Sequence, residues 1–511
     1  MKSRMRGLVS LLSALGLVGF VACASFDGDD GNTSSSSGNP PSPDGQDGGN
    51  VVVTMPGSLK VTFASSPRLI QGASAKVHVK VDRASIAGTV TITGKNLPEG
   101  VGIVPLELKE GVSEGDLELT ASATAKQGDA KGATVLARSE AGSSADSGMS
   151  LFVRGAPGSP DTTYGTNGSM DLGDTSSGYA AVAISPTTPP MIYVHGGGTI
   201  QRFTIDGQPD PTFPKAPITD VSYLVAGKDL SVYALTFTRT VVKILKTGVR
   251  DATFGTAGEA GPFGGVAADY TNFIALDTND RVLYPWKKSN ILNPDQLLRL
   301  NVAGETDSAF SYTAYSRGGS SSTSFAELLP QQDGTTVAAV GSFNGAAILR
   351  ISSTGATLET KETPTEDGLG ASSTRQTPSE LFMLHVPSNN VDRAITRFGL
   401  DLVRDTTFGT DGFAKLPPYV YFEGSGTGVD LAVDAKKRLI ATCFTRIAGT
   451  GQLAISRFLT NGKPDTSFAP SGFVTMPSES SSNLRIIESD PERAIIAGAR
   501  GTRAFIARFW M

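Results

Sequence analysis

A short motif recurs through residues 158–511 of this chain, and it constrains the fold more than any other feature. In the motif, a basic residue that ends an apolar run is followed by Gly five positions later, Asp eight positions later and an aromatic residue eleven positions later. The copies begin at Arg202, Lys243, Arg299, Arg350, Arg397, Arg457 and Arg508. Successive copies lie between 41 residues apart (Arg202 to Lys243) and 60 residues apart (Arg397 to Arg457). This period is typical of the blades of a propeller.

Two copies of the motif are incomplete. The copy at Arg397 has Leu402 in the Gly position, and the copy at Arg350 has Leu358 and Lys361 in the Asp and aromatic positions. The complete copies are Arg202 with Gly207, Asp210 and Phe213; Lys243 with Gly248, Asp251 and Phe254; Arg299 with Gly304, Asp307 and Phe310; and Arg457 with Gly462, Asp465 and Phe468.

The last copy is divided between the two ends of the repeat region. Arg508 lies close to Met511, whereas Gly158, Asp161 and Tyr164 supply the second half of a motif at the start of the region. A repeat divided in this way indicates a closed ring. We therefore expect a strand at 505–509 to pair with the strands that begin the ring.

Between the motif copies, two apolar runs flank a polar turn. In 328–341 the turn contains Asp333 and Gly334, which is a hairpin signal. Further hairpins of this kind are predicted at 181–194, 273–284, 431–441 and 484–498. With a strand that ends at the basic residue and a strand after the aromatic residue, each repeat contains four strands. We therefore predict an all-β chain whose residues 156–511 form a seven-bladed β-propeller.

The motif residues have structural explanations. Gly permits the positive φ of a tight turn, Asp can accept backbone N–H groups in the next turn, and the aromatic residue can fill the gap between neighbouring sheets. The aspartates lack the alternating oxygen ligands of a calcium loop, so we predict no metal site. We also predict no bound cofactor.

Residues 56–155 alternate polar and apolar side chains in short runs. Val77, Val79 and Val81 would face one side of a strand, and His78 and Lys80 the other. About seven such strands without a helical period indicate an immunoglobulin-like β-sandwich.

The N-terminus has the features of an export signal. Lys2, Arg4 and Arg6 precede an uncharged apolar run that is too short to cross a bilayer as a helix. The run ends in Phe20-Val21-Ala22-Cys23, which resembles the lipobox of bacterial lipoproteins, with Phe in the position where Leu is usual. The resemblance implies that 1–22 is a signal peptide and that Cys23 carries the lipid. Ala24 favours sorting to the outer membrane rather than retention at the inner membrane.

Residues 23–55 are rich in Ser, Gly, Asp, Asn and Pro and predict a disordered tether with a reach of about 30 Å. Removal of 1–22 with its three basic side chains would change the formal net charge from -5 to -8. An acidic body argues against nucleic acid as a partner. We expect the membrane to be contacted through the lipid, the protein to be a monomer, and the ligand to be a protein or a glycan.

The repeats also resemble a known family. The segments Arg457-Phe458 to Phe468 and Arg404-Asp405 to Gly412 are similar to the delta-60 repeat of bacterial extracytoplasmic proteins, and the similarity covers about 157–511. The resemblance implies a propeller in the cell envelope, on the periplasmic or the surface-facing side. It supplies no catalytic residues.

Few residues suggest chemistry. We expect His78 to be solvated, His195 to be structural or solvated in a strand end before a glycine turn, and Cys443 to be a small apolar strand residue. The Gly-x-Ser-x-Gly match at 111–115 precedes a predicted strand, whereas a nucleophile elbow opens a helix. Gly196-Gly197-Gly198 lacks the Lys of a phosphate-binding loop, so it is interpreted as a turn.

Scattered carboxylates leave an enzyme open as the alternative. These are Asp171, Asp174, Asp220, Asp269, Asp430 and Asp434, of which any two could converge at the central channel as a glycosidase pair. The leading interpretation is a lipid-anchored envelope protein that binds or scaffolds and has no catalytic residues. The alternative is a hydrolase or lyase that acts on polysaccharide through carboxylates in the channel.

Overall fold

The computed structural model describes residues 59–175, 180–263, 273–286, 295–316, 323–342, 345–362, 369–387, 393–417, 430–447, 450–477, 481–490 and 492–511. The predicted signal peptide, Cys23, the tether and Asp269 lie outside these residues. The described part of the chain is all-β, as predicted, and contains no helix. None of its elements is a helix long and apolar enough to span a bilayer.

Two sheets enclose one hydrophobic core in the N-terminal part of the described chain. The first sheet contains β1 (Lys60–Phe63), β3 (Ser74–Asp82), β7 (Glu114–Ala121) and β5 (Val101–Ile103); the second contains β2 (Arg68–Ile70), β9 (Ser144–Arg154), β8 (Gly128–Ser139), β4 (Val90–Lys95) and β6 (Leu106–Leu108). Val77, Val79 and Val81 are buried in this core, whereas His78 and Lys80 on the same strand are exposed, as their alternation predicts. Gly111 ends a turn, and Glu114 and Gly115 are already the first residues of β7, so no nucleophile elbow forms at 111–115.

Seven small sheets follow within the described residues. They contain, in strand order, β11 (Val182–Ile184), β12 (Met191–Gly196), β13 (Thr199–Thr204) and β14 (Ala216–Pro217); β15 (Val221–Ala226), β16 (Val232–Thr236), β17 (Val241–Ile244) and β18 (Glu259–Ala260); β19 (Ala275–Leu276), β20 (Val282–Trp286) and β21 (Gln296–Leu300); β22 (Thr323–Pro330), β23 (Thr336–Ser342), β24 (Gly345–Ile351) and β25 (Thr357–Glu362); β26 (Leu369–Gln376), β27 (Glu380–Pro387), β28 (Ala394–Gly399) and β29 (Ala414–Lys415); β30 (Asp430–Val433), β31 (Leu439–Ile447), β32 (Thr450–Phe458) and β33 (Phe473–Pro477); and β34 (Ser481–Asp490), β35 (Arg493–Arg500), β36 (Arg503–Trp510) and β10 (Ser169–Asp174). Each sheet is named below by the first strand given for it. The hairpins predicted from the apolar runs are confirmed as the first two strands of these sheets.

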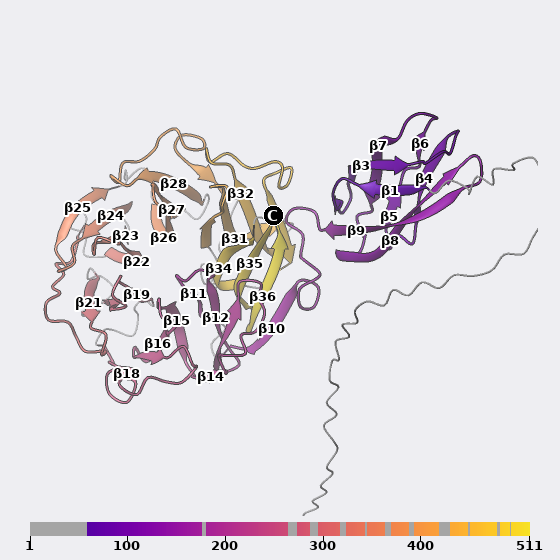
Figure 1. Ribbon diagram of the computed structural model, residues 1–511. Coiled ribbons are helices and arrows are strands. Elements are labelled where there is room, and N and C mark those ends of the chain that lie inside the picture. Colours follow the sequence, from indigo (N-terminus) through magenta and orange to yellow (C-terminus); the bar gives the residue numbers. More distant parts are fainter. Residues whose placement is uncertain are drawn as a thin grey trace, which may run out of the picture. The chain divides into compact units, whose positions relative to one another are not determined.

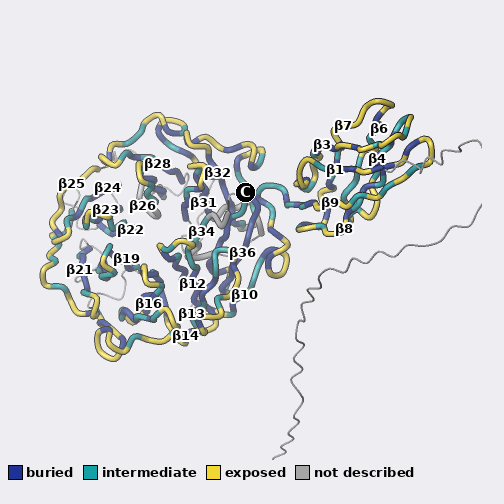
Figure 2. The backbone as a smooth tube through the Cα atoms, in the orientation of Figure 1, coloured by how far each residue is buried: buried dark blue, intermediate teal, exposed yellow. Residues whose placement is uncertain are grey.

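The sheets follow one another around a common centre, as Figure 1 shows. The first strands contact each other in circular order, from β11 through β15, β19, β22, β26, β30 and β34 back to β11. A separate hydrophobic cluster fills each junction between consecutive sheets, including the junction between β34 and β11. Figure 2 shows buried residues within the sheets and exposed residues along many of the connecting loops. This radial arrangement of antiparallel sheets is that of a β-propeller.

The closure predicted from the divided motif is confirmed. The outer strand β10, near the start of the ring, pairs antiparallel with β36 at the C-terminus. Asp171 lies opposite Phe505, and Ser169 lies opposite Ala507. The ring is therefore closed by a sheet to which both ends of the repeat region contribute strands.

In the motif copies that contain the Asp, this residue forms an ion pair with the basic residue of the motif, which was not predicted from the sequence. In the five copies that contain both the Arg and the Asp, the arginine Nε donates to one carboxylate oxygen of the Asp at 2.7–3.0 Å: Arg202–Asp210, Arg299–Asp307, Arg397–Asp405, Arg457–Asp465 and Arg508–Asp161. The other oxygen accepts the backbone N–H two residues later, as predicted, for example that of Thr407 at 2.8 Å. The guanidinium also lies over the motif aromatic ring, 4.6–5.0 Å from its centre. The motif arginine therefore contacts both the Asp of the turn and the aromatic side chain, and it holds the two together.

The motif also joins each sheet to the next. Arg202 donates to the carbonyl of Lys246, and Arg397 donates to that of Thr460, both at 2.9 Å and both in the turn of the following copy. The motif aromatic packs against the following Gly: a Cβ at Gly462 would lie 2.8 Å from the ring of Phe408. Full burial of such a ring contributes about 1.5–3 kcal/mol.

Candidate ligand site at the centre of the ring

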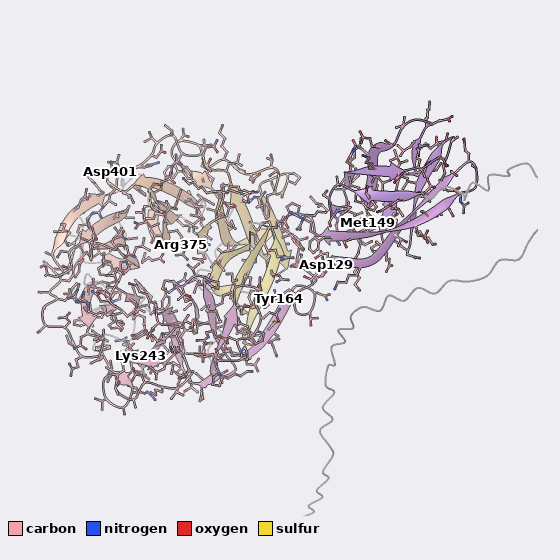
Figure 3. All side chains as sticks on the ribbon, viewed as in Figure 1. Asp129, Met149, Tyr164, Lys243, Arg375 and Asp401 are labelled. Carbon is pink, nitrogen blue, oxygen red and sulfur yellow. The ribbon has the colours of Figure 1, made fainter. Side chains whose placement is uncertain are left out.

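A cavity of about 420 Å³ lies among the first strands at the centre of the ring. Its described lining comes from β11, β15, β26, β30 and β34: Val182, Ala183, Ile184, Tyr223, Leu224, Val225, Ala226, Arg375, Gln376, Ala432, Val433, Arg485, Ile486 and Ile487. Most of this wall is aliphatic. Arg375 and Arg485 are the charged side chains among these lining residues, and Figure 3 labels Arg375 near the middle of the ring.

Irregularities in the strands accompany the polar side chains of the site. The pairing register shifts between Val221 and Tyr223 in β15, and between Ser482 and Arg485 in β34. A third shift lies just before Glu327 in β22. Because a β-bulge inserts an unpaired residue and re-aims the side chains that follow it, these shifts provide a local reason for polar groups to point to the centre.

The polar residues form one connected cluster. Arg375 Nη1 lies 3.0 Å from Glu327 Oε1, and Arg375 Nη2 lies 2.5 Å from Asp430 Oδ1. Arg485 Nη1 donates to the same Asp430 oxygen at 3.3 Å, and its Nη2 donates to the Tyr223 hydroxyl at 2.6 Å. Five sheets of the ring therefore contribute one residue each to the cluster.

The two carboxylates of the cluster are occupied by protein donors. Asp430 has a fully buried side chain, and its Oδ2 accepts the backbone N–H of Ile486 at 2.9 Å. Glu327 Oε2 accepts the N–H and the hydroxyl of Thr374. Neither carboxylate is among the described lining residues of the cavity. They orient the arginines instead of facing a ligand.

The two arginines are partly exposed, and their raised pKa values keep them positively charged. Their side chains are 26% (Arg375) and 22% (Arg485) exposed. Burial by itself lowers the pKa of Arg375, but the charges of Asp430 and Glu327 outweigh it, so the pKa is raised. The pKa of Arg485 is also raised, because Tyr223 and Asp430 outweigh its burial. Burial raises the pKa of Tyr223, so its hydroxyl stays protonated at neutral pH.

The guanidinium groups retain donors for a ligand. Each has five N–H donors. Among the described residues, Arg375 uses Nη1 twice, toward Glu327 and the Thr374 carbonyl, and Nη2 once, and Arg485 uses one bond from each Nη. Cationic donors in an aliphatic wall suit a ligand with an anionic group on an apolar body.

The carboxylates considered from the sequence do not converge at the central cavity. Asp171 and Asp174 lie near Arg503 on the outer strand pair, Asp434 pairs with Arg438 in a hairpin turn, and Asp220 lies in the turn before β15. Among the described members of that set, Asp430 alone joins the central cluster. None of the described members of the set is among the described lining residues of the central cavity, so they form no glycosidase-type pair there.

His78, His195 and Cys443 have local explanations. His78 is exposed and lies 3.0 Å from Asp116, which raises its pKa. His195 is buried, its Nε2 lies 3.0 Å from the Ile218 carbonyl, and burial lowers its pKa, so it is structural. Cys443 is fully buried, as expected for an apolar strand residue. The described residues contain no group of three or more His, Cys, Asp or Glu side chains placed to hold a metal ion.

The sequence reading missed Tyr223, Glu327, Arg375 and Arg485. Their signal is weak, because each occurs once, in a different repeat. Charged residues in strands that should face a packed centre are nevertheless unusual. Aligned hairpins would therefore have marked Arg375 and Arg485 as departures from the apolar pattern.

The sequence matches no protein-family model, and the search of curated proteins found no relative. Solved structures similar to this chain include a streptogramin B lyase, with 12% identity, 67% of this chain and 97% of that chain covered, and a TM-score of 0.42. Two others are the hydrazine synthase of Kuenenia stuttgartiensis (12% identity, 63% and 96% covered, TM-score 0.40) and YCF48 bound to D1 peptide (13% identity, 70% and 100% covered, TM-score 0.39). The propeller fold of this chain is assigned from its own strand pairing and from the circular order of the contacts between its sheets.

Proposed function

We propose that this protein is a lipid-anchored binding protein of the bacterial cell envelope, which uses its propeller to engage a protein or a glycan. In this proposal Cys23 carries the lipid, 23–55 is the tether, 56–155 is an immunoglobulin-like sandwich, and 156–511 is a seven-bladed propeller of delta-60 type. The lipobox-like tetrapeptide and the repeat motif support it. Ala24 supports an outer-membrane location within this proposal.

The ligand group that fits the centre of the ring is an anion on an apolar body, such as an acidic side chain or an acidic sugar. One observation carries this proposal: Arg375 and Arg485 reach the cavity, while Asp430 and Glu327 are turned toward the arginines. A ligand anion would add to guanidinium groups that are already held in place, so little side-chain entropy would be lost on binding.

The alternative of a polysaccharide hydrolase or lyase requires carboxylates that can reach a substrate. Asp430 has no exposed surface, and Glu327 accepts three hydrogen bonds from Thr374 and Arg375. The geometry of the described residues therefore favours binding over this chemistry.

Titration of the full-length protein with oligogalacturonate, with polyglutamate and with a neutral cello-oligosaccharide tests the ligand class. We expect an acidic probe to bind, more weakly at high salt, and Arg485→Gln to weaken binding about tenfold or more. Arg503→Gln is the matched control, because Arg503 forms an exposed ion pair with Asp171 outside the cavity. Absence of binding by both acidic probes, or equal binding by Arg485→Gln, contradicts the proposal. Release of unsaturated uronate or new reducing ends would favour the enzyme.

The anchor requires a separate experiment. Intact mass and membrane fractionation are compared between the protein expressed in a bacterial host and its Cys23→Ser variant. An acylated N-terminus that is lost in the variant supports the tethered protein. A soluble, unlipidated product cut at another site contradicts it.

A further inference from the structure

The copy of the motif at Arg350 lacks the turn that the other copies build. In the other copies the N–H of the motif aromatic residue donates to the carbonyl of the motif Asp, for example Phe408 to Asp405 and Phe468 to Asp465. After Gly355, however, the chain enters strand β25 almost at once, and β25 pairs along most of β24. Leu358 and Lys361, in the Asp and aromatic positions, lie on this strand and are exposed.

This junction is therefore packed differently from its neighbours. Hydrophobic clusters at the six other junctions include a motif aromatic residue: Tyr164, Phe213, Phe254, Phe310, Phe408 and Phe468. The described cluster between the β22 and β26 sheets includes Leu402 and no motif aromatic. Leu402 replaces the motif Gly and has φ 59, a conformation that is costly for a residue with a Cβ.

A second cavity, of about 310 Å³, lies at this junction. Its described lining consists of Gln331, Gln332, Asp333, Val337, Arg350, Gln376, Leu381, Leu400 and Leu402. This volume is near the lower limit of ordinary ligand pockets, so it suits one small ligand unit. At each of the other junctions, the motif supplies an aromatic side chain. The cavity lies at the junction where the motif lacks this side chain.

The polar groups of this wall are planar and partly pre-organised. Gln331 and Gln376 bond each other through both amides, at 2.8 and 2.7 Å. Arg350 donates to the Leu400 carbonyl at 2.7 Å, which preserves the link to the next sheet. Asp333 Oδ1 accepts the N–H and the hydroxyl of Thr335. Among the described residues, these bonds leave Asp333 Oδ2 available.

We propose that the junction cavity, which is lined by Asp333, Arg350, the Gln331–Gln376 pair and the four aliphatic side chains, binds one neutral saccharide unit. Vicinal hydroxyl groups both donate and accept, so they can match a carboxylate, a guanidinium and amides at the same time. The aliphatic side chains would cover the C–H face of the sugar ring. The inference goes beyond the acidic-ligand site and does not depend on it, because the two cavities share only Gln376 among their lining residues.

Four variants test this assignment. Asp333→Asn removes the carboxylate from the cavity, and Asp229→Asn is its matched control, because Asp229 makes the same bonds to the N–H and hydroxyl of Ser231 in another hairpin turn. Leu400→Trp narrows the cavity from an exposed position, and Leu459→Trp is its control at an exposed leucine of the next copy. Because all four positions are exposed or in turns, we expect all four proteins to fold.

Full-length protein is applied to an array of neutral hexoses, pentoses, N-acetylhexosamines and their disaccharides, and the best probe is then titrated calorimetrically. We expect Asp333→Asn and Leu400→Trp to weaken binding about tenfold or more, and the two controls to bind within about twofold of the original protein. Failure to bind any neutral sugar, or equal losses in Asp333→Asn and Asp229→Asn, overturns the proposal. Binding that depends on Arg485 and not on Asp333 also overturns it, while the proposal for the central cavity stands.

Discussion

The buried carboxylate of Asp161 offers the sharpest test of how the ring is closed. One of its oxygens accepts from Arg508 Nε at 2.8 Å and lies 3.0 Å from Arg493 Nε. The other accepts the N–H and the hydroxyl of Thr163 at 3.0 and 2.6 Å. Asp161 therefore joins the start of the ring to two strands near the C-terminus.

Asp161→Asn keeps the shape of the side chain and removes its charge. The Asp161 side chain is fully buried and that of Arg508 is 9% exposed, so the substitution leaves a buried guanidinium without its counter-charge. Breaking a buried ion pair in this way costs about 3–5 kcal/mol. Asp171→Asn is the control: Asp171 pairs with Arg503 across the same β10–β36 closure, but the two side chains are 53% and 56% exposed. An exposed pair contributes about 0–1 kcal/mol.

Urea unfolding followed by tryptophan fluorescence measures both free energies of unfolding. Trp510 is fully buried at the end of β36 and reports on this strand. We expect the midpoint for Asp161→Asn to fall well below that of Asp171→Asn, with the slope unchanged. A loss below about 1 kcal/mol for Asp161→Asn, or equal losses in the two variants, would refute the role of the buried network in closure.

Further predictions concern closure, packing and titration. Deletion of 504–511 removes most of β36 and should lower the melting temperature sharply; an unchanged temperature rejects the closure. Gly462→Ala should cost about 1–2 kcal/mol in urea unfolding, since Gly462 has φ 79 and its new Cβ would press on Phe408. Burial raises the pKa of Cys443 to about 12, so thiol reagents should label it only after unfolding, and fast labelling of the native protein would contradict this. Burial lowers the pKa of His385 to about 3, whereas this side chain binds a proton near pH 6.5 in the unfolded chain. The stability that depends on neutral His385 is therefore fully present above pH 6.5 and is lost as the pH falls toward 3. Unfolding free energies at pH 7 and pH 4.5 should therefore differ less in His385→Gln than in the original protein.

The repeated parts of the fold could be predicted because their interactions are local and recur. Gly462 and Asp465 act within a few residues of Arg457, so one copy of the motif already contains most of the information, and the other copies confirm it. The same holds for the hairpin around Asp333, where residue spacing fixes the turn. The closure between β10 and β36 could be predicted because the motif is divided at that point.

The pairing of the motif Asp with its Arg was missed for a physical reason. A sequence places Asp465 in a turn, where its bond to the N–H of Ser467 is expected. The bond to Arg457 depends on how the chain turns back onto its own strand, and that path is visible only in three dimensions. The sequence does contain one indication of this pairing. The Arg350 copy lacks both the Asp and the aromatic residue, as expected if the same guanidinium holds the two.

Both candidate sites arise where the chain departs from its own repeat, and this follows from the way a ring of similar sheets is stabilised. An intact junction is filled by an aromatic ring, a guanidinium and a close-packed glycine, so it has no room for a ligand. Space for a ligand therefore requires a copy that does not build its turn, as after Gly355, or a charged residue where a strand should be apolar, as at Arg375 and Arg485. These departures involve different residues in different copies, so the repeated pattern that makes the ring predictable from sequence does not reveal its binding residues.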